Sequence, residues 1–569
     1  MSYLHAADYV VIGIYLLATL GLGAWFSRTQ KTTKDFFLAG QRMHWMPVAL
    51  SLVVTVISAL SFTGIPAMTY QVGLLMLGMI AACWLALPII IWVALPFYYN
   101  LRLYSAYEYL EKRFNLAVRM ASSMIWVIWR LLWLGGVLYA PCKALLFAVG
   151  IDETANREAV YAMLIGLGAL TTAYTFLGGM KAVIWTDAAQ FCVIMVGIAM
   201  VVGIAIFGPQ GAGLARSWEM ATEHGLTQIT HLEFNWSDNW AIWGFGPHMF
   251  LAVLSFSIAD QITLQRMLTT PNLAASKRSV VAGTISNTCM LMLLILVGMS
   301  LFVFYHGNPD KYQDLVRAAP NEALAPILAE NPDHDLSALV ATTQTPDIDT
   351  NRALPYFIVT ELPVGLAGMI VAALFAASMS SMDSGLNSLS TSMIVDFHRR
   401  LGWGRQWMAR RYHKTPADLN ESEELFLGRA LTLGMGVLAT SMAIVVSHIE
   451  DIWTIMTTMV NTAGGPLLVV FLLGMLSRRI GPRGALLGLV LGVLFTVWIT
   501  FAANIAASTG WTWLWPFKFD AIWNLTFGVC FTIVVAYVVS FLFDPKPDRM
   551  HLEGLVVGVG KPGQTMETA

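Results

Sequence analysis

Charged side chains are scarce in this sequence. Asp, Glu, Lys and Arg make up 12% of its 569 residues and hydrophobic residues make up 57%, whereas soluble proteins contain about 25% charged residues. A soluble fold of this size could not keep so much apolar surface away from water. The low charge content therefore excludes an ordinary soluble protein and predicts an integral membrane protein.

Motifs for disulfide bonding, transition-metal binding and nucleotide hydrolysis are absent as well. No CxxC pair occurs, and the five cysteines all lie in apolar runs, which favours small core residues: Cys83, Cys142, Cys192, Cys289 and Cys530. No GxxxxGK[ST] loop occurs, so nothing indicates ATP-driven pumping. No segment outside the apolar runs is long enough for a catalytic domain. We therefore expect no enzyme activity, no cofactor and no nucleic-acid partner.

Apolar runs long enough to cross a bilayer recur along the chain. They lie near 8–27, 46–70, 73–97, 122–149, 159–178, 184–207, 240–264, 281–305, 356–395, 428–447, 452–476, 484–505 and 521–543. Because a spanning helix needs about 20 apolar residues, these runs predict an all-α membrane protein with about thirteen transmembrane helices. The first run has no basic region before it, so we interpret it as a span and not as a cleaved signal peptide.

The distribution of Lys and Arg predicts the orientation. With the N-terminus outside, the inside segments hold 24 of the 33 Lys and Arg residues and the outside segments hold six. The inside segments are 27–44, 97–121, 178–183, 265–280, 396–427, 477–484 and the tail after 543. Because positive residues gather on the cytoplasmic side, we expect the cell (inner) membrane, an extracytoplasmic N-terminus and a cytoplasmic C-terminus. Basic loop 396–427 fits such a stop signal, with lipid-headgroup contact as the alternative.

The run around residue 380 contains an unusual set of polar side chains. Ser380, Asp383, Ser384 and Asn387 recur at spacings that place them on one helix face. Such groups are costly within a membrane and are usually functional. Their oxygen atoms suit a hard cation, whereas zinc or copper would need His or Cys. The alternative is a polar seam that packs helices together.

The second run contains Gly64 and Pro66 in a Ser- and Thr-rich stretch, which predicts a helix interrupted at that point. Freed carbonyl groups are tolerated at membrane depth only where they line a cavity or hold an ion. Together with the hydroxyl face around residue 380, the interruption predicts a sodium-sized site of carbonyl and hydroxyl oxygens.

Several motifs resemble those of the sodium/solute symporter family, from residue 8 to near residue 543. The matching stretches are Asp35–Gly40, Glu108–Phe114, Gly178–Gln190, Asp260–Arg266, Ser380–Ser388 and Gly464–Pro466, the last of which is expected to break the eleventh span. The segment Val137–Pro141 is similar to the iodide, vitamin and monocarboxylate branch of that family.

The resemblance implies a LeuT-like core of two inverted five-helix repeats, each beginning with a helix broken at mid-membrane. The expected organisation is a first span with its loop over 1–45, repeat 1 over 46–207, an extracellular loop over 208–239, repeat 2 over 240–476 with loops 306–355 and 396–427, two further spans over 477–543, and a tail over 544–569.

The resemblance also implies two ion sites. The main sodium site would consist of the carbonyls of Val54, Ile57 and Ala377 and the hydroxyls of Ser380 and Ser381. A second site matches Asp187, Ser380, Asp383 and Ser384. The family usually has Ser or Thr where this chain has Asp383. The two carboxylates would strengthen a second sodium site or share a proton, and both interpretations stay open.

For the substrate, Lys143 falls where family members place a polar or charged ligand, which is Arg in the sialic-acid carriers. A carboxylate would provide the counter-ion that a buried Lys needs. The alternatives are that Lys143 reaches the outer interface or pairs with an internal Asp. Arg130 is expected to be a structural partner of a carboxylate or of freed carbonyls. Sugar carriers have Glu and Gln where this chain has Ile80 and Thr457, which argues against a sugar. The remaining candidate ligands are Ser61, Thr63, Cys83, Asp260, Gln261, Asn287, Thr458 and Asn461.

These observations predict a sodium-coupled symporter that imports a small organic solute by alternating access, a carboxylate rather than a sugar. We expect the solute, Na⁺ and the lipid bilayer as its partners and a monomer or loose oligomer as its state. The alternatives are a sugar or other neutral-solute symporter and, from another class, a membrane sensor with a transporter fold.

Overall fold

The computed structural model describes residues 4–27, 33–101, 103–151, 156–321, 324–325, 328, 348–402, 410–411, 421–448, 452–510, 520–546 and 549–559. Within these ranges the regular structure is helical, apart from two isolated β-bridges. Eleven helical segments of the described chain are long and apolar enough to cross a membrane, and two shorter apolar helices cover Ala6–Leu22 and Trp45–Val56. The prediction of an all-α membrane fold is confirmed, with a number of crossings that remains approximate.

The elements follow in chain order. They are α1 (Ala6–Ser27), α2 (Thr33–Leu38), η1 (Ala39–Gln41), α3 (Trp45–Val56), α4 (Ala59–Val72), η2 (Gly73–Leu77), α5 (Gly78–Ile89), η3 (Ile90–Ala94), α6 (Leu95–Leu101), α7 (Ala106–Arg113), α8 (Leu116–Ala148), α9 (Arg157–Phe207), α10 (Gly213–Glu223), α11 (Ile242–Leu254), η4 (Ser255–Ala259), α12 (Gln261–Met267), α13 (Leu273–Gly307), α14 (Pro309–Ala318), α16 (Thr350–Glu361), α17 (Leu366–Ser392), η5 (Met393–His398), α18 (Arg399–Leu401), α20 (Glu421–Val446), α21 (Ile452–Leu476), α22 (Pro482–Thr509), α23 (Trp523–Phe543) and α24 (Arg549–Leu552).

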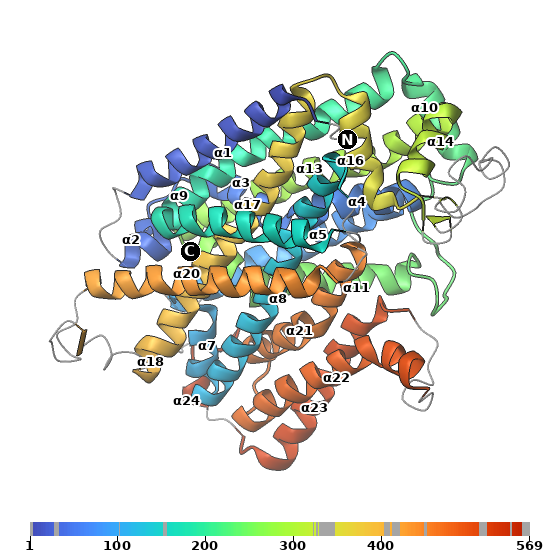
Figure 1. The fold of residues 1–569 in the computed structure, drawn as a ribbon. Helices are drawn as coiled ribbons and strands as arrows, with labels where there is room; N and C mark the ends of the chain where they lie inside the picture. The colour runs from blue at the N-terminus through green and yellow to red at the C-terminus, as the bar shows by residue number, and fades with distance from the viewer. Residues whose placement is uncertain are drawn as a thin grey trace.

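The connecting helices gather at two ends of the bundle. Helices α10, α14 and α16 lie at one end, and α2, α7, α18 and α24 lie toward the opposite end (Figure 1). The first set comes from the segments predicted to be outside, except that the second half of α16 falls in the predicted span 356–395, and the second set comes from those predicted to be inside. At the periphery, α1 packs against α9 and α17, whereas α22 and α23 pack against each other and against α21.

Two helices are broken, the first near its middle and the second closer to its C-terminal end. The first breaks after α3, where Ile57 (φ −83°, ψ 91°) and Ser58 (φ −88°, ψ 179°) are extended before α4 begins. The second breaks at Asp260 (φ −90°, ψ 121°), which caps α12 by accepting a hydrogen bond from the backbone N–H of Ile262. The breaks fall in the second and the seventh predicted spans, where the two repeats were expected to begin.

The first break does not lie at Gly64 and Pro66, where the sequence predicted it. Both of these residues lie buried inside α4, because membrane helices accommodate proline where neighbouring groups satisfy the freed backbone. Likewise, Pro466 does not break α21, which runs without interruption from Ile452 to Leu476. Gly464 and Gly465 serve close packing there: a Cβ atom on Gly464 would lie 3.0 Å from Ser255 Oγ.

The predicted loop 178–183 is a kink within α9. Gly179 adopts φ 55° at this point, a conformation that glycine reaches without steric cost. The kink separates the two predicted spans, which the structure places at Arg157–Phe176 and Gly178–Phe207.

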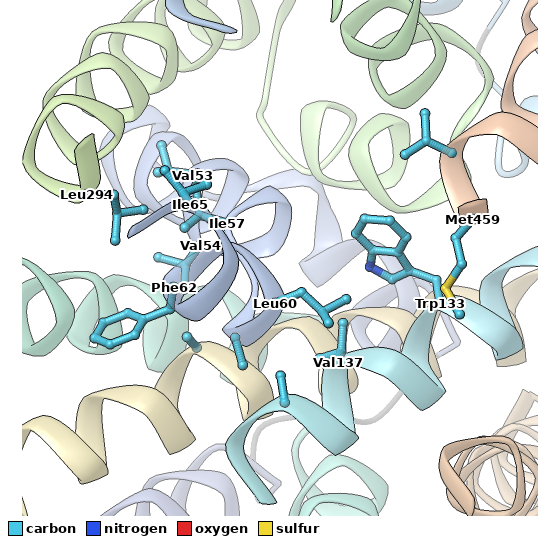
Figure 2. Close-up of a cluster of buried hydrophobic side chains, with 14 of the residues drawn as sticks. Val53, Val54, Ile57, Leu60, Phe62, Ile65, Trp133, Val137, Leu294 and Met459 are labelled. Carbon is cyan, nitrogen blue, oxygen red and sulfur yellow. The ribbon is translucent and has the colours of Figure 1, made fainter. Parts of the chain in front are cut away.

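Apolar side chains fix the first break between its neighbours. Figure 2 shows Val54, Ile57 and Leu60 on the broken helix, with Leu294 of α13 on one side and Val137 of α8 on the other. Four of the five are at most 1% exposed and Ile57 is 3% exposed. Because lipid is as apolar as these side chains, close packing holds the helices together more than exclusion from water does.

A cluster of charges ties α8 to the end of α17. Asp396 in η5 is fully buried and accepts hydrogen bonds from Arg119 Nε (3.0 Å) and Nη2 (2.7 Å). The hydroxyls of Ser105, Ser123 and Ser392 also donate to this carboxylate, at 2.7–3.1 Å. Arg119 further pairs with Glu111 at 2.7 Å. Burial alone would raise the pKa of Glu111, but hydrogen bonds from Arg119 and Arg400 hold it below its usual value.

The substitution Asp396→Asn is expected to destabilise the fold by about 3–5 kcal/mol, because it leaves a buried guanidinium without its main counter-charge. The measurement is the apparent melting temperature in detergent. Glu111→Gln is the matched control, because its carboxylate is half-buried and its loss should cost about 1 kcal/mol or less. Equal melting temperatures for the two variants would show that Asp396 is not the main counter-charge of Arg119.

Candidate ion and substrate sites

The hydroxyl face of α17 meets the free end of α3. Ser380 Oγ lies 3.2 Å from the carbonyl oxygen of Val54 and 3.1 Å from that of Ala377. Ser381 Oγ lies 3.5 Å from the Val54 carbonyl oxygen and 3.3 Å from that of Thr55. The structure therefore brings together four of the five predicted sodium ligands, and Ile57 lies at the break itself. The Thr55 carbonyl was missed because carbonyl ligands came only from the family resemblance, which implied Val54, Ile57 and Ala377.

These oxygens fit a cation of sodium's size. A comparable hard cation, Ca²⁺, takes oxygen ligands at about 2.3–2.6 Å, so two ligands at a right angle lie about 3.4 Å apart. Each hydroxyl has lone pairs that it can turn toward a cation in place of its hydrogen. Ser58 Oγ is buried at the same break and has no hydrogen-bond partner among the described residues. Within the described part of the chain, no group of three or more His, Cys, Asp or Glu side chains could hold a metal ion.

A second buried cluster contains the predicted second-site residues and one guanidinium. Arg266 pairs with Asp187 (Nη2 to Oδ2, 3.3 Å) and donates to the hydroxyls of Ser51 (2.8 Å) and Ser384. Ser51 in turn donates to Asp187 at 2.5 Å. Asp187 Oδ1 is buried and has no partner among the described residues. The sequence analysis gave Arg266 only as the end of a motif and did not predict its contact with Asp187. Residues distant in sequence decide what a guanidinium contacts.

Asp383 occupies the other side of this cluster. Its carboxylate accepts hydrogen bonds from the hydroxyls of Tyr174, on α9, and of Ser384. Asp187, Arg266 and Asp383 are all fully buried. Two carboxylates and one guanidinium give the three groups a formal charge of −1, and an uncompensated charge within a membrane needs a partner.

A central cavity of about 130 Å³ lies beside the first break. Thr55, Ile57 and Ser61 line it from the broken helix, so the same segment contributes to the main ion site and to the cavity wall. Most of the remaining wall is apolar. It includes Ile65, Met79, Trp133, Met249, Phe256, Leu291 and Val460.

The charged part of the cavity wall is Arg130 with Asp260. Arg130 Nη2 lies 3.3 Å from Asp260 Oδ2, and the Trp126 indole donates to Asp260 Oδ1 at 2.8 Å. Arg130 is therefore the partner of a carboxylate, as expected, and it also lines the cavity, which was not expected.

The predicted substrate ligands divide into two groups. Those that line the cavity are Ser61, Cys83, Asp260, Asn287 and Thr457. Those that do not line it are Thr63, Ile80, Lys143, Gln261, Thr458 and Asn461. Thr63 donates to the Ala59 carbonyl, Gln261 bonds the backbone of Tyr104 and Ala106, and Asn461 donates to the Ala521 carbonyl. The apolar runs placed these side chains in spans, but they could not say which way each side chain faces.

Lys143 lies at the α16 end of the bundle. Its Nζ is 3.9 Å from Asp349 Oδ2, just before α16, and Asp349 also pairs with Arg352 at 3.2 Å. Nearby, Gln71 Nε2 donates to the Thr350 hydroxyl at 2.7 Å, which joins α4 to α16. Among the described residues, Lys143 therefore pairs with an Asp of the predicted extracellular loop 306–355, and not with an internal Asp.

A second cavity adjoins the first on the side away from the α16 end of the bundle. The two share Val56, Cys83, Val253, Phe256, Thr263 and Asn287. The second extends past Leu52, Met267 and Gly283, which belong to the halves of their helices predicted to face the cytoplasm.

The fold and the oxygen site define a multi-pass membrane transporter of LeuT-like architecture. The chain belongs to the sodium:solute symporter family, whose profile matches residues 36–492. It is therefore a transporter and not an enzyme.

Similar proteins are known from bacteria and animals. The chain is 27% identical to the sodium/sialic acid symporter NanT of Aliivibrio fischeri, over 99% of this chain and 98% of the relative. It is 31% identical to the sodium-dependent multivitamin transporter of Oryctolagus cuniculus, over 89% of this chain and 72% of the relative. The solved substrate-bound, outward-open structure of a Na⁺-coupled sialic acid symporter matches with a TM-score of 0.75 at 24% identity, over 95% and 99% of the two chains. This last match shows the shared fold.

Proposed function

We propose that this protein is a sodium-coupled symporter that imports a small organic carboxylate by alternating access. One observation carries the proposal: the carbonyl and hydroxyl oxygens at the α3 break adjoin a cavity that contains a buried guanidinium. The carbonyl and hydroxyl oxygens suit Na⁺, and the guanidinium suits an anion.

The shared segment at the break explains how the two solutes are coupled. Sodium held between Val54, Ala377, Ser380 and Ser381 would fix α3 against α17. The adjoining residues Thr55 to Ser61 form part of the cavity wall, so the same ion would also order the substrate site. By linkage, sodium then raises the affinity for the solute, and the solute raises the affinity for sodium by the same factor.

The size and lining of the cavity support a compact substrate. An engineered cavity of about 150 Å³ holds one benzene molecule, and the central cavity measures about 130 Å³. A monocarboxylate with an apolar body fits such a space, whereas a sialic acid is much larger. The mainly apolar wall would leave the hydroxyls of a sugar without partners.

The net charge of the second cluster supports a second coupling cation. Asp187, Arg266 and Asp383 together carry a formal charge of −1, so either Na⁺ or a proton would neutralise them. In this proposal α16, joined to α4 by Gln71, closes the extracytoplasmic side, and the second cavity is the path to the cytoplasm.

The proposal predicts that an inward sodium gradient drives accumulation of a radiolabelled monocarboxylate in proteoliposomes. Propionate, lactate and benzoate are suitable probes, and the expected accumulation is at least about tenfold over the external concentration, which corresponds to about 1.4 kcal/mol taken from the gradient.

The control replaces external sodium by potassium, which should abolish accumulation. A membrane sensor with this fold would bind a carboxylate without accumulating it. Accumulation of a sugar in place of the acids would support the neutral-solute alternative and contradict the proposal.

A further inference from the structure

Arg130 is a buried cation whose hydrogen-bonding capacity is only partly used. It lies on α8, is 3% exposed and lines the central cavity. Its Nη2 meets Asp260, but Nε and Nη1 are buried and have no hydrogen-bond partner among the described residues. A guanidinium is always charged and offers five N–H donors, and buried donors without acceptors are unfavourable. A positive group with unused donors therefore borders the cavity.

Asp260 and Trp126 hold this guanidinium in place. Asp260 lies at the second helix break, accepts the Trp126 indole N–H at 2.8 Å and caps α12. Its carboxylate is thereby fixed on two sides and contacts only one edge of Arg130. The ring of Trp133 lies 5.8 Å from Arg130 Cζ. The remaining nitrogens, Nε and Nη1, have no acceptor among the described residues, and the side chain that carries them borders the cavity.

The charges explain why this anion site would need sodium. Arg130 and Asp260 form a neutral pair, so a carboxylate entering the cavity adds one negative charge. Sodium bound at the carbonyls of Val54 and Thr55 adds one positive charge, and Thr55 itself lines the cavity. The two solutes together leave the site neutral, whereas either one alone leaves a charge in a region of low dielectric.

Lys143 is the competing candidate, and its surroundings argue against it. It pairs with Asp349 at the α16 end and does not line the cavity. We infer that Arg130, positioned by Asp260 and Trp126, binds the carboxylate of the transported solute. This inference rests on the proposed function and assigns its specificity to one side chain.

The test compares two charge-removing variants, Arg130→Gln and Lys143→Gln, in sodium-driven benzoate uptake. Because hydrogen bonds to charged groups account for about 10- to 100-fold in affinity, KM should rise by about that factor in Arg130→Gln. Lys143→Gln should leave KM within about threefold, because Lys143 lies outside the cavity and is 3.9 Å from its partner Asp349. Thermal stabilisation by sodium without benzoate should persist in both variants and shows that each is folded.

In Arg130→Gln the buried Asp260 carboxylate loses its counter-charge, which could unfold the protein. The double variant Arg130→Gln with Asp260→Asn removes both charges and avoids this. It keeps the site neutral and should lose the preference for benzoate over benzamide by at least about tenfold. A merely structural role of Arg130 would leave that preference unchanged.

The inference is overturned if Arg130→Gln keeps the wild-type KM or if Lys143→Gln raises it equally. It is also overturned if the wild-type protein accumulates benzamide but not benzoate, an outcome that leaves sodium coupling intact. The proposed function fails separately, when sodium drives no uptake in the wild-type protein.

Discussion

Replacing Ser381 by alanine is expected to abolish sodium-driven uptake while leaving the protein folded and inserted. Ser381 Oγ lies within 3.5 Å of the carbonyl oxygens of both Val54 and Thr55, at the point where α3 ends. Losing this oxygen leaves the ion with one ligand fewer and with carbonyl dipoles held by fewer contacts. Because interactions of this kind with a charge are each worth about 1.5–3 kcal/mol, the half-saturating sodium concentration should rise by about 10- to 100-fold.

The measurement is initial uptake as a function of sodium, with the amount of inserted protein determined in parallel. Ser388→Ala is the matched control: Ser388 lies on the same helix, is fully buried, and its hydroxyl has no partner among the described residues. Unchanged sodium dependence in Ser381→Ala, or an equal loss in Ser388→Ala, would rule out this hydroxyl as a sodium ligand.

Replacing Asp383 by serine is expected to reduce transport by one cation per solute. The change removes one negative charge from a fully buried cluster and leaves Asp187 paired with Arg266 at 3.3 Å, so the remaining pair is neutral. A neutral cluster no longer needs a second cation, because the cost of an uncompensated charge in the membrane has disappeared. The family resemblance also implies Ser or Thr at this position.

The cation-to-solute ratio can be measured from the reversal potential and from radiolabelled sodium uptake in the same vesicles. Loss of one sodium per cycle would identify the second cation as Na⁺, whereas loss of a co-transported proton, followed with a pH-sensitive dye, would identify a proton. Asp383→Glu keeps the charge and should keep the ratio. A ratio unchanged in Asp383→Ser would show that no second cation depends on Asp383.

Local sequence was sufficient where a signal depends on a single helix. The face that contains Ser380, Asp383 and Ser384 follows from helical spacing alone, and the structure buries all three. Where helices end was less predictable. Gly64 and Pro66 indicated the first break, but it lies at Ile57 and Ser58, where α3 and α4 pack against α13 and α4 also packs against α8, contacts that local sequence does not contain.

The two arginines show what spacing cannot resolve. Arg266 and Asp187 are 79 positions apart, and Arg130 and Asp260 are 130 apart, yet each pair lies 3.3 Å apart. Arg130 and Lys143 are thirteen positions apart on one helix, and sequence alone favoured the lysine as the substrate ligand. The structure places the lysine at α16 and the arginine at the cavity.

The sequence by itself determined that the chain lies in a membrane, that it is helical and that oxygen-rich faces occur within its spans. Those properties follow from the cost of placing charges and backbone groups in lipid, which every span meets separately. Only the tertiary structure decided which carbonyls face Ser381, which carboxylates receive a guanidinium and which cation borders the cavity. The physical reason is that these contacts join helices distant in the chain, and helix packing, not local preference, sets their distances.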